Sequence, residues 1–310
     1  MPESRRRVTV VYNPMKVDDL DADQGVVAEA CRRHGWDEPQ WIPTTAEETG
    51  EKQAREAVEA GADVVATLGG DGTVRAVATA LVGTDVALGL LPGGTGNLLA
   101  RNLDLPVDSI KDAMEPLLTG SDLRLDVGFV AADDDPEEVF LIMTGLGFDG
   151  EIMAGTNERV KGVLGWPAYL LSGLGNLFNR GFTVEVTASG AAGVVGQPGD
   201  RLRRHARTVI VGNCGTLQGG IELMPEAEYD DGVLDAVVIA PRGAFGWASV
   251  IADVSTRHRV GHQRLDRMRG RDFTIVANRP TETEIDGDPV GPRSRLDIRV
   301  EPSSLVVRHG

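Results

Sequence analysis

Short apolar runs alternate with amphipathic stretches along the first 120 residues of the chain. Apolar runs bounded by turn residues predict buried strands, and apolar positions spaced by three or four residues predict helices. This pattern places strands at residues 7–12, 40–42, 63–66 and 86–91, and helices at residues 20–34, 47–60, 75–82 and 98–103. Strands that alternate with helices are typical of a parallel sheet with helices on both faces. We therefore predict a doubly wound α/β domain over residues 1–122.

The alternation of strands and helices ends after Gly120. Residues 122–130 alternate between polar and apolar, residues 133–138 form an acidic turn, and residues 139–143 are apolar. Further strands are predicted at residues 208–211, 273–276, 281–285, 296–300 and 305–308. Such a meander is typical of an antiparallel sheet. We expect a second, mainly antiparallel β domain over residues 123–310, with its extreme C-terminal strand as a candidate to pack back on the first domain.

Two glycine-rich turns follow predicted strands and precede predicted helices. The first is Thr67-Leu-Gly-Gly-Asp-Gly-Thr-Val74, and the second is Pro92-Gly-Gly-Thr-Gly-Asn97. We expect the three glycines of the first turn to adopt positive φ and to let the backbone approach a ligand closely. The helix starts behind them offer unpaired N–H groups and a positive dipole end, which favour phosphate. Both turns are expected at one edge of the sheet, where ligands bind in open parallel sheets.

Asp71 is unusual within the first turn, because a carboxylate repels phosphate unless it holds a cation or a proton-donating hydroxyl. A magnesium-bound nucleotide would suit both the glycines and the carboxylate. The alternative is a plain strand-to-helix turn in which Asp71 is the helix N-cap. Neither turn fits the pattern G-x-x-x-x-G-K-[ST], so the predicted site differs from a P-loop.

The segments Gly69-Gly-Asp-Gly-Thr73 and Pro92-Gly-Gly-Thr-Gly-Asn97 resemble the diacylglycerol kinase catalytic-domain family, which includes bacterial lipid kinases and sphingosine kinases. Separate motifs extend the resemblance over nearly the whole chain. The resemblance implies an ATP-dependent lipid kinase that uses Mg²⁺ and transfers the γ-phosphate to a lipid hydroxyl. Diacylglycerol is the expected acceptor and phosphatidic acid the product. The second domain would bind the lipid.

The resemblance implies a nucleotide site built from backbone N–H groups, threonine hydroxyls and a carboxylate that organises Mg²⁺ and the γ-phosphate. Its residues are Asn13, Thr45, Gly69, Gly70, Asp71, Gly72, Thr73, Gly93, Gly94, Thr95, Gly96 and Asn97. Asn13 is followed by Met-Lys-Val-Asp, without the glycine that family members carry, so we expect a differently shaped loop. Thr44 is an alternative to Thr45, and N-capping of the helix predicted at residues 47–60 explains a threonine here equally well.

A pair of carboxylates in Asp286-Gly-Asp-Pro289 lies between two predicted strands. Family members usually carry Asp-Gly-Glu here, at the mouth of the active site. The resemblance implies that Asp286 accepts the proton of the lipid hydroxyl, with Asp288 as the competing candidate. The alternative is a hairpin turn, for which Asp-Gly is a strong signal.

The acidic segment Glu228-Tyr-Asp-Asp-Gly-Val-Leu-Asp235 also matches the family's pattern. Carboxylates around a tight glycine turn suit a hard cation with oxygen ligands. The resemblance implies a structural Mg²⁺ site, with Asp231 and the Val233 carbonyl as ligands and Glu228 as a further candidate. The alternative is a hairpin turn with solvated acids.

Residues 160–178 form the most apolar helix candidate of the second domain. They suit a buried core helix, and they also resemble the family's segment at this place, which implies an apolar wall of a lipid-accepting cleft. The two interpretations are compatible, because one helix face can be core while the other lines a cleft. We expect the acceptor hydroxyl in a cleft between the two domains.

The composition narrows the range of partners. A formal net charge of −16 disfavours binding to nucleic acid, which requires clustered Lys and Arg, and broad adsorption to anionic lipid. Two cysteines make no disulfide framework. We expect neither a signal peptide nor a transmembrane helix, since no apolar run reaches about 18 residues. We expect a cytoplasmic protein that is peripheral to the membrane when it acts. Its oligomeric state stays open, and a homodimer is one of the alternatives.

Two other functions stay open. An NAD kinase also carries Gly-Gly-Asp-Gly-Thr on a similar first domain, although residues 92–97 and the segment Asp231-Gly-Val-Leu-Asp235 argue against it. A non-catalytic protein that binds lipid or nucleotide is the second, because the loop after Asn13 and the aspartate at 288 depart from the family's pattern. The lipid also stays open among diacylglycerol, a sphingoid base and a polyol lipid, each of which presents a hydroxyl beside apolar chains.

Overall fold

A computed structural model describes residues 6–94, 96–147, 181–190, 201–217, 221–241 and 265–310. The chain divides into two units, one of residues 1–127 with 302–310 and one of residues 128–301. The domain boundary predicted after residue 122 lies at the start of strand β5 (Ser121–Ala132) and stays a prediction.

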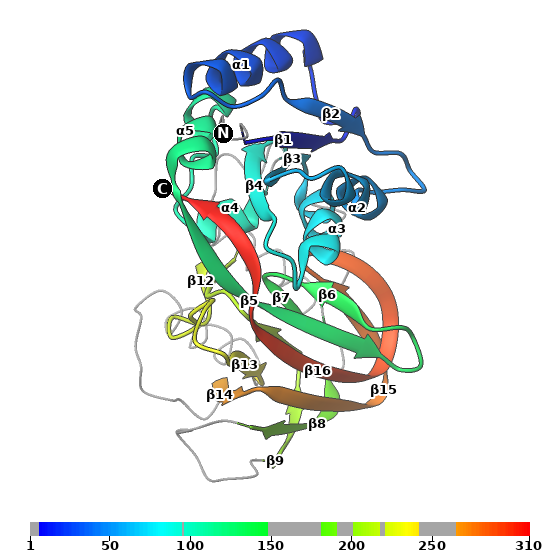
Figure 1. The fold of residues 1–310 in the computed structure, drawn as a ribbon. Helices are drawn as coiled ribbons and strands as arrows, with labels where there is room; N and C mark the ends of the chain where they lie inside the picture. Colours follow the sequence, from blue (N-terminus) through cyan, green and yellow to red (C-terminus); the bar gives the residue numbers. More distant parts are fainter. Residues whose placement is uncertain (1–5, 95, 148–180, 191–200, 218–220, 242–264) are drawn as a thin grey trace, which may run out of the picture. The chain divides into compact units, whose positions relative to one another are not determined.

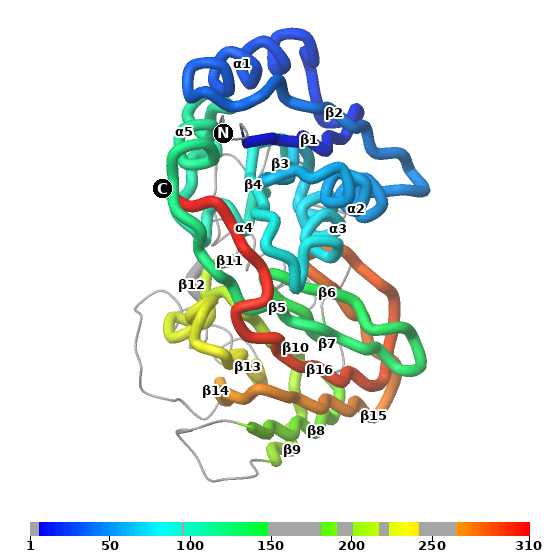
Figure 2. The backbone as a smooth tube through the Cα atoms, viewed as in Figure 1, coloured from blue at the N-terminus to red at the C-terminus, as the bar shows by residue number. Residues whose placement is uncertain are grey.

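The first unit is built on a parallel sheet. Its strands include β1 (Val8–Tyr12), β2 (Gln40–Pro43), β3 (Val64–Gly69) and β4 (Ala87–Pro92). They are ordered β2–β1–β3–β4, and each neighbouring pair is parallel (Figure 2). The last part of β16 (Asp288–His309) adds a parallel neighbour to β4 through the pair Val307 and Leu88. All of β3 is buried, as expected for a strand covered on both faces.

Helices cover both faces of this sheet (Figure 1). They include α1 (Leu20–Arg33), α2 (Glu51–Glu59), α3 (Asp71–Leu81), α4 (Leu98–Asn102) and α5 (Ile110–Thr119). On one face α1 and α5 pack together, and Val27 and Met114 belong to a shared apolar cluster with alternate residues of β1 and β3. On the other face α2 packs against α3. This arrangement confirms the predicted doubly wound α/β domain.

Two helices begin at residues other than those predicted. α2 begins at Glu51, four residues late, because Gly50, with φ of 141°, is its N-cap. α3 begins at Asp71, four residues early, inside the glycine motif itself. Gly72 and Thr73 therefore lie in the first turn of α3.

The second unit is mainly antiparallel, as predicted. Its strands include part of β5, β6 (Glu138–Phe140), β7 (Met143–Leu146), β8 (Phe182–Ser189), β9 (Arg201–Ala206), β10 (Thr208–Gly212), β11 (Thr216–Leu217), β12 (Ile221–Glu222), β13 (Leu234–Ile239), β14 (Leu265–Gly270), β15 (Asp272–Ile285) and the first part of β16. The order β14–β13–β10–β7–β15 is antiparallel at each step. β15 then pairs with both β16 and β8.

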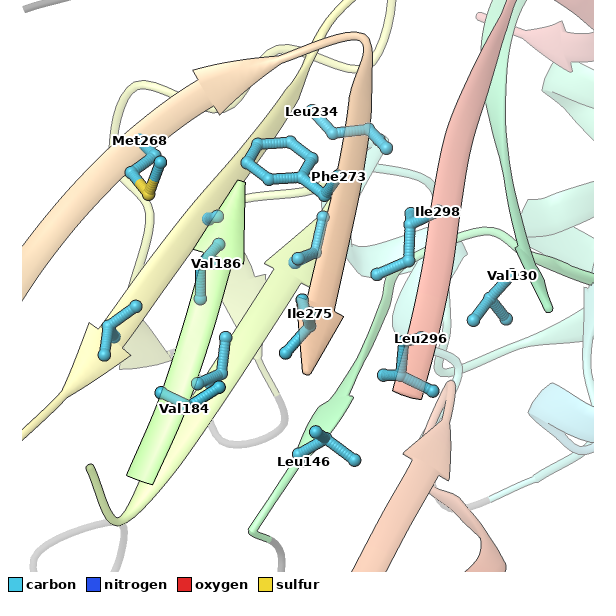
Figure 3. Packing of buried hydrophobic residues seen from close by; sticks show 14 of the residues in the cluster. Val130, Leu146, Val184, Val186, Leu234, Met268, Phe273, Ile275, Leu296 and Ile298 are labelled. Carbon is cyan, nitrogen blue, oxygen red and sulfur yellow. The ribbon is translucent and has the colours of Figure 1, made fainter. Parts of the chain in front are cut away.

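Alternate residues of these strands fill one apolar core (Figure 3). Phe273 and Ile275 of β15, Leu296 and Ile298 of β16, and Val186 of β8 are each at most 3% exposed. Their spacing follows from the pleat, which points successive side chains to opposite faces. Truncation of a buried phenylalanine to alanine costs about 3–5 kcal/mol, so this core holds β15 firmly.

The single strand predicted at residues 139–143 is two strands. Leu141 and Ile142 separate β6 from β7. β6 pairs with β5, whereas β7 pairs with β10 and β15, so the chain changes partners at these two residues.

The apolar segment at residues 160–178 lies outside the described residues, and both of its interpretations stay predictions. Within the described ranges, no helix combines the length and the apolar character that crossing a bilayer requires.

Candidate functional site

The two glycine-rich turns lie side by side at the carboxyl ends of β3 and β4. Gly69 is the register partner of Pro92 in this parallel pair, so the turns that follow leave the sheet next to each other. Asn13, at the end of β1, joins them, because its N–H donates to the Leu68 carbonyl at 2.9 Å. This edge is where ligands bind in open parallel sheets.

The glycines are required by close packing of the turns on each other. A Cβ atom at Gly93 would lie 2.5 Å from the Gly69 nitrogen, and one at Gly94 would lie 2.9 Å from the Gly70 Cα. A side chain at either position would push the turns apart. The positive φ predicted for Gly69, Gly70 and Gly72 is wrong, since none of the three has a φ in the left-handed region. Close approach, not the backbone dihedral, excludes other residues here.

Asp71 links the two turns. Its Oδ1 accepts the Leu98 N–H at 2.7 Å, at the first residue of α4. A Cβ atom at Gly96 would lie 2.2 Å from Oδ2 of Asp71, so that glycine leaves room for the carboxylate. The N-cap of α3 is Gly70, so the alternative interpretation of Asp71 as that N-cap is wrong. The sequence argument for a cation missed the backbone partner of this carboxylate.

The N-terminus of α3 lies at this edge. Its N-cap, Gly70, offers no side-chain cap, and no atom lies within 4 Å of a Cβ placed there. The N-termini of α1 and α5 are capped by the side chains of Asp19 and Ser109, whereas those of α2 and α4, like that of α3, have no side-chain cap. α3 spans 11 residues, and the dipole of a helix of this length favours a phosphate at its N-terminus.

The threonines of the predicted nucleotide site differ in exposure. Thr73 and Thr44 are each 6% exposed. Thr45 is exposed, and its Oγ1 accepts the Glu48 N–H at 3.1 Å, which closes a turn ahead of α2. Thr45 therefore does not cap α2. Thr95 lies outside the described residues.

Two asparagines of the predicted site bond to their own loops. The Asn13 Oδ1 accepts the Met15 N–H at 2.9 Å, which shapes the loop that lacks the family's glycine. Asn97 has φ of 47°, and its Nδ2 donates to the Gly94 carbonyl at 2.9 Å. Each side chain holds the shape of a loop at the ligand edge.

In the second unit, a two-residue turn joins β15 to β16. Asp286 and Gly287 have φ of 51° and 87°, as in a type I′ hairpin turn. Ile285 and Asp288 face each other across it. The hairpin expected from Asp-Gly is therefore present, and Asp288 is exposed at the first position of β16.

The Asp286 carboxylate is buried and accepts three backbone N–H groups. Its Oδ2 accepts from Leu141 at 2.9 Å, and its Oδ1 accepts from Ile142 at 2.8 Å and from Met143 at 3.0 Å. These donors lie where the chain passes from β6 to β7. Three N–H bonds stabilise the ionised carboxylate, which makes it a weak proton acceptor.

A buried glutamate that sequence reasoning missed precedes this turn. Glu284 is 2% exposed, and its Oε1 has no hydrogen-bond partner among the described residues. Burial first, and then the charges of Asp286 and Asp288, raise the pKa of Glu284 to about 8, so it is neutral near pH 7. Its signal in the sequence is the third acid in Glu-Ile-Asp-Gly-Asp.

Glu284→Gln is expected to stabilise the protein at alkaline pH. The unfolded chain loses this proton near the ordinary pKa of 4.5, whereas the folded chain keeps it up to a pKa of about 8. The folded state binds more protons between these values, so the free energy of unfolding falls as pH rises through that window. The melting temperature of the variant should exceed that of the wild type by a margin that grows with pH.

Thermal unfolding from mildly acidic to alkaline pH measures this margin. Glu282→Gln, at an exposed position of the same strand, is the matched control and should show no growing margin. A pH-independent difference between Glu284→Gln and the wild type would contradict the raised pKa.

The acidic turn before β13, which covers residues 228–233, is held by an arginine. The Asp231 Oδ1 accepts the Val233 N–H at 3.1 Å, and its Oδ2 pairs with Arg269 of β14. Arg269 also lies 3.3 Å from Asp235, while Glu228 is exposed. Among the described residues, no three of the types His, Cys, Asp and Glu are placed to hold a metal. Arg269 pairs with an Asp231 oxygen that the predicted Mg²⁺ would share, and the structural Mg²⁺ stays a prediction.

Comparison with known proteins extends over both units. Residues 7–130 match the family described as diacylglycerol kinase catalytic domain. Residues 144–309 match the family described as YegS C-terminal NAD kinase beta sandwich-like domain.

Curated relatives and solved structures agree with these matches. A probable lipid kinase YegS-like of Pseudomonas fluorescens is 31% identical over 87% of this chain and 85% of its own length. One of the same description from Cronobacter sakazakii is 30% identical over 82% of this chain and 80% of its own. A diacylglycerol kinase structure from Bacillus anthracis, 19% identical, shares the fold with a TM-score of 0.72 over 99% of this chain and 98% of that one. The chain belongs to the YegS-like lipid kinase family, with a diacylglycerol kinase catalytic domain followed by a YegS C-terminal domain.

Proposed function

We propose that the protein transfers the γ-phosphate of ATP to the hydroxyl of diacylglycerol and so forms phosphatidic acid. Membership of a lipid kinase family implies ATP as donor and a lipid as acceptor. The description of the matched catalytic domain supports diacylglycerol as that lipid. The single observation that carries the nucleotide half is the N-terminus of α3, which has no side-chain cap and lies against the second glycine turn.

The backbone of the two turns would bind the nucleotide phosphates. N–H groups at the start of α3 and in the turn of Gly93 and Gly94 are fixed by the packing of the turns, so they need no rearrangement to meet an anion. Asn13, Thr45 and Asn97 border this edge and would contact the rest of the nucleotide.

Asp71 would hold the Mg²⁺ that accompanies ATP. Carboxylate oxygen is a ligand that Mg²⁺ prefers, and the Leu98 N–H fixes one oxygen of Asp71 in place. The ion would neutralise charge on the transferred phosphoryl group. The residues of this edge therefore fit a magnesium-bound nucleotide.

We propose Asp288 as the group that accepts the hydroxyl proton. Asp288 is exposed at the start of β16, where a substrate hydroxyl can reach it. The three amide bonds to Asp286 argue against the expectation that Asp286 is the base. Asp286 would instead fix the hairpin turn that carries Asp288.

The two rival functions are an NAD kinase and a non-catalytic binding protein. The second matched family is described as NAD kinase beta sandwich-like, which favours NAD as the alternative acceptor. A non-catalytic protein would bind nucleotide or lipid without turnover.

Transfer of radiolabel from the γ-phosphate of ATP tests the proposal. Diacylglycerol, a sphingoid base and a polyol lipid are offered in separate mixed micelles, and NAD in solution. Label in phosphatidic acid is the expected result. Label in another lipid would replace the acceptor, label in NAD would replace the function, and nucleotide binding without transfer to any acceptor would favour the non-catalytic protein. Because diacylglycerol resides in bilayers, transient contact with a membrane surface belongs to this proposal, and co-sedimentation with vesicles measures it.

A further inference from the structure

The acidic turn before β13 needs a positive charge. Residues 226–235 contain five acids and no Lys or Arg. Like charges held close together repel one another, and partial burial strengthens that repulsion because water screens it less. The side chains of Asp231 and Asp235 are only 21% and 11% exposed. A cation from outside the segment that pairs with these two carboxylates would offset their charge.

Arg269 supplies that charge from the neighbouring strand. It is the register partner of Asp235 across β13 and β14, and its Nε lies 3.3 Å from that carboxylate. Its Nη2 pairs with the Asp231 Oδ2. The planar guanidinium thus bridges the acidic turn and the first part of β13 with separate nitrogens, a geometry that a lysine cannot reproduce.

A metal ion and this guanidinium exclude each other. A divalent ion bound to Asp231 would lie beside the positive charge of Arg269, and the two cations would compete for the same oxygens. Freeing the Asp231 Oδ2 for a metal requires Arg269 to break its pair with that oxygen.

We propose that Arg269 is the resident cation of this turn, in the place where the resemblance predicts a structural Mg²⁺, and that the protein holds the turn without metal. Arg269 and a divalent cation are alternative partners of these carboxylates, and Arg269 is the partner in this protein. This inference does not rest on the proposed function, because it concerns the protein without nucleotide.

Thermal unfolding of the protein without nucleotide tests the proposal. The melting temperature is compared between a buffer with EDTA and a buffer with excess Mg²⁺. The wild type should melt at the same temperature in both. Arg269→Gln frees the carboxylates, so in EDTA it should melt at least about 2–4 °C below the wild type, the shift expected when one modest interaction is lost. Excess Mg²⁺ should restore part of that loss in Arg269→Gln.

Arg204→Gln is the matched control, because Arg204 pairs with Asp266 at 3.0 Å between strands, away from the acidic turn. It should show no response to Mg²⁺. A wild-type melting temperature that falls on chelation would overturn the proposal, and so would an Arg269→Gln protein that melts like the wild type and ignores Mg²⁺. If Arg269→Gln fails to fold, Arg269→Lys replaces it. This variant should show a smaller fall in melting temperature and a smaller response to Mg²⁺. A wild-type melting temperature that responds to EDTA still overturns the proposal.

Discussion

Asp71→Asn is expected to abolish phosphoryl transfer and leave the fold intact. Asparagine keeps an oxygen that can accept the Leu98 N–H, which Asp71 accepts at 2.7 Å, so the link between the two turns survives. The substitution removes the negative charge proposed to hold Mg²⁺ against the phosphates. Turnover should fall by at least about 10²–10³-fold, the loss found when one preorganised electrostatic contact with a transition state is removed.

Asp71→Ala separates the two roles of this carboxylate. It removes the charge and also leaves the buried end of α4 without its acceptor, which costs about 1–3 kcal/mol. Both variants should lose transfer of radiolabelled phosphate at saturating Mg²⁺ and ATP, but only Asp71→Ala should also melt at a lower temperature. If Asp71→Asn keeps wild-type turnover, Asp71 serves only to tie the turns together, and the proposal that it holds Mg²⁺ is wrong.

The position of the edge proposed to bind nucleotide follows from the sequence, because two successive strand-turn-helix units of a parallel sheet bring their turns to one edge. The reason for the glycines does not follow in the same way. Gly93 is required by the backbone of Gly69, a neighbour only because β3 and β4 are in register. A glycine's sequence context indicates that a side chain is excluded there, but not which backbone excludes it.

Long-range polar contacts explain what the sequence missed in the second unit. Residues 139–143 are apolar throughout, so the pattern predicts one strand. The break at Leu141 and Ile142 turns their N–H groups toward Asp286, about 145 residues later in the chain. The bridge from Arg269 to Asp231 also joins different elements, across 38 residues of the chain. Periodicity reports which side of an element is buried, and it carries no information on such partners.

Asp288→Asn is expected to bind ATP like the wild type and to lose about 10²–10⁴-fold in the rate of transfer, the usual contribution of a general base. Asp288 is exposed, so loss of its charge should leave the melting temperature unchanged. Asp288→Glu keeps a carboxylate and matches the Asp-Gly-Glu usual in the family, so it should restore most of the rate. Transfer of radiolabel, equilibrium binding of ATP and thermal unfolding measure the three effects separately.

Asp286→Asn should behave differently, because it acts on the fold. Its NH₂ group would replace one of the oxygens that accept from Leu141, Ile142 and Met143, so donor would face donor at a buried site. A buried N–H without an acceptor costs about 1–3 kcal/mol, so the variant should melt at a lower temperature and lose activity in proportion to its loss of folded protein. If folded Asp286→Asn is inactive while Asp288→Asn keeps near-normal turnover, Asp286 is the base despite its three amide bonds. If both variants keep near-normal turnover, neither carboxylate accepts the proton, and the hairpin turn has only a structural role.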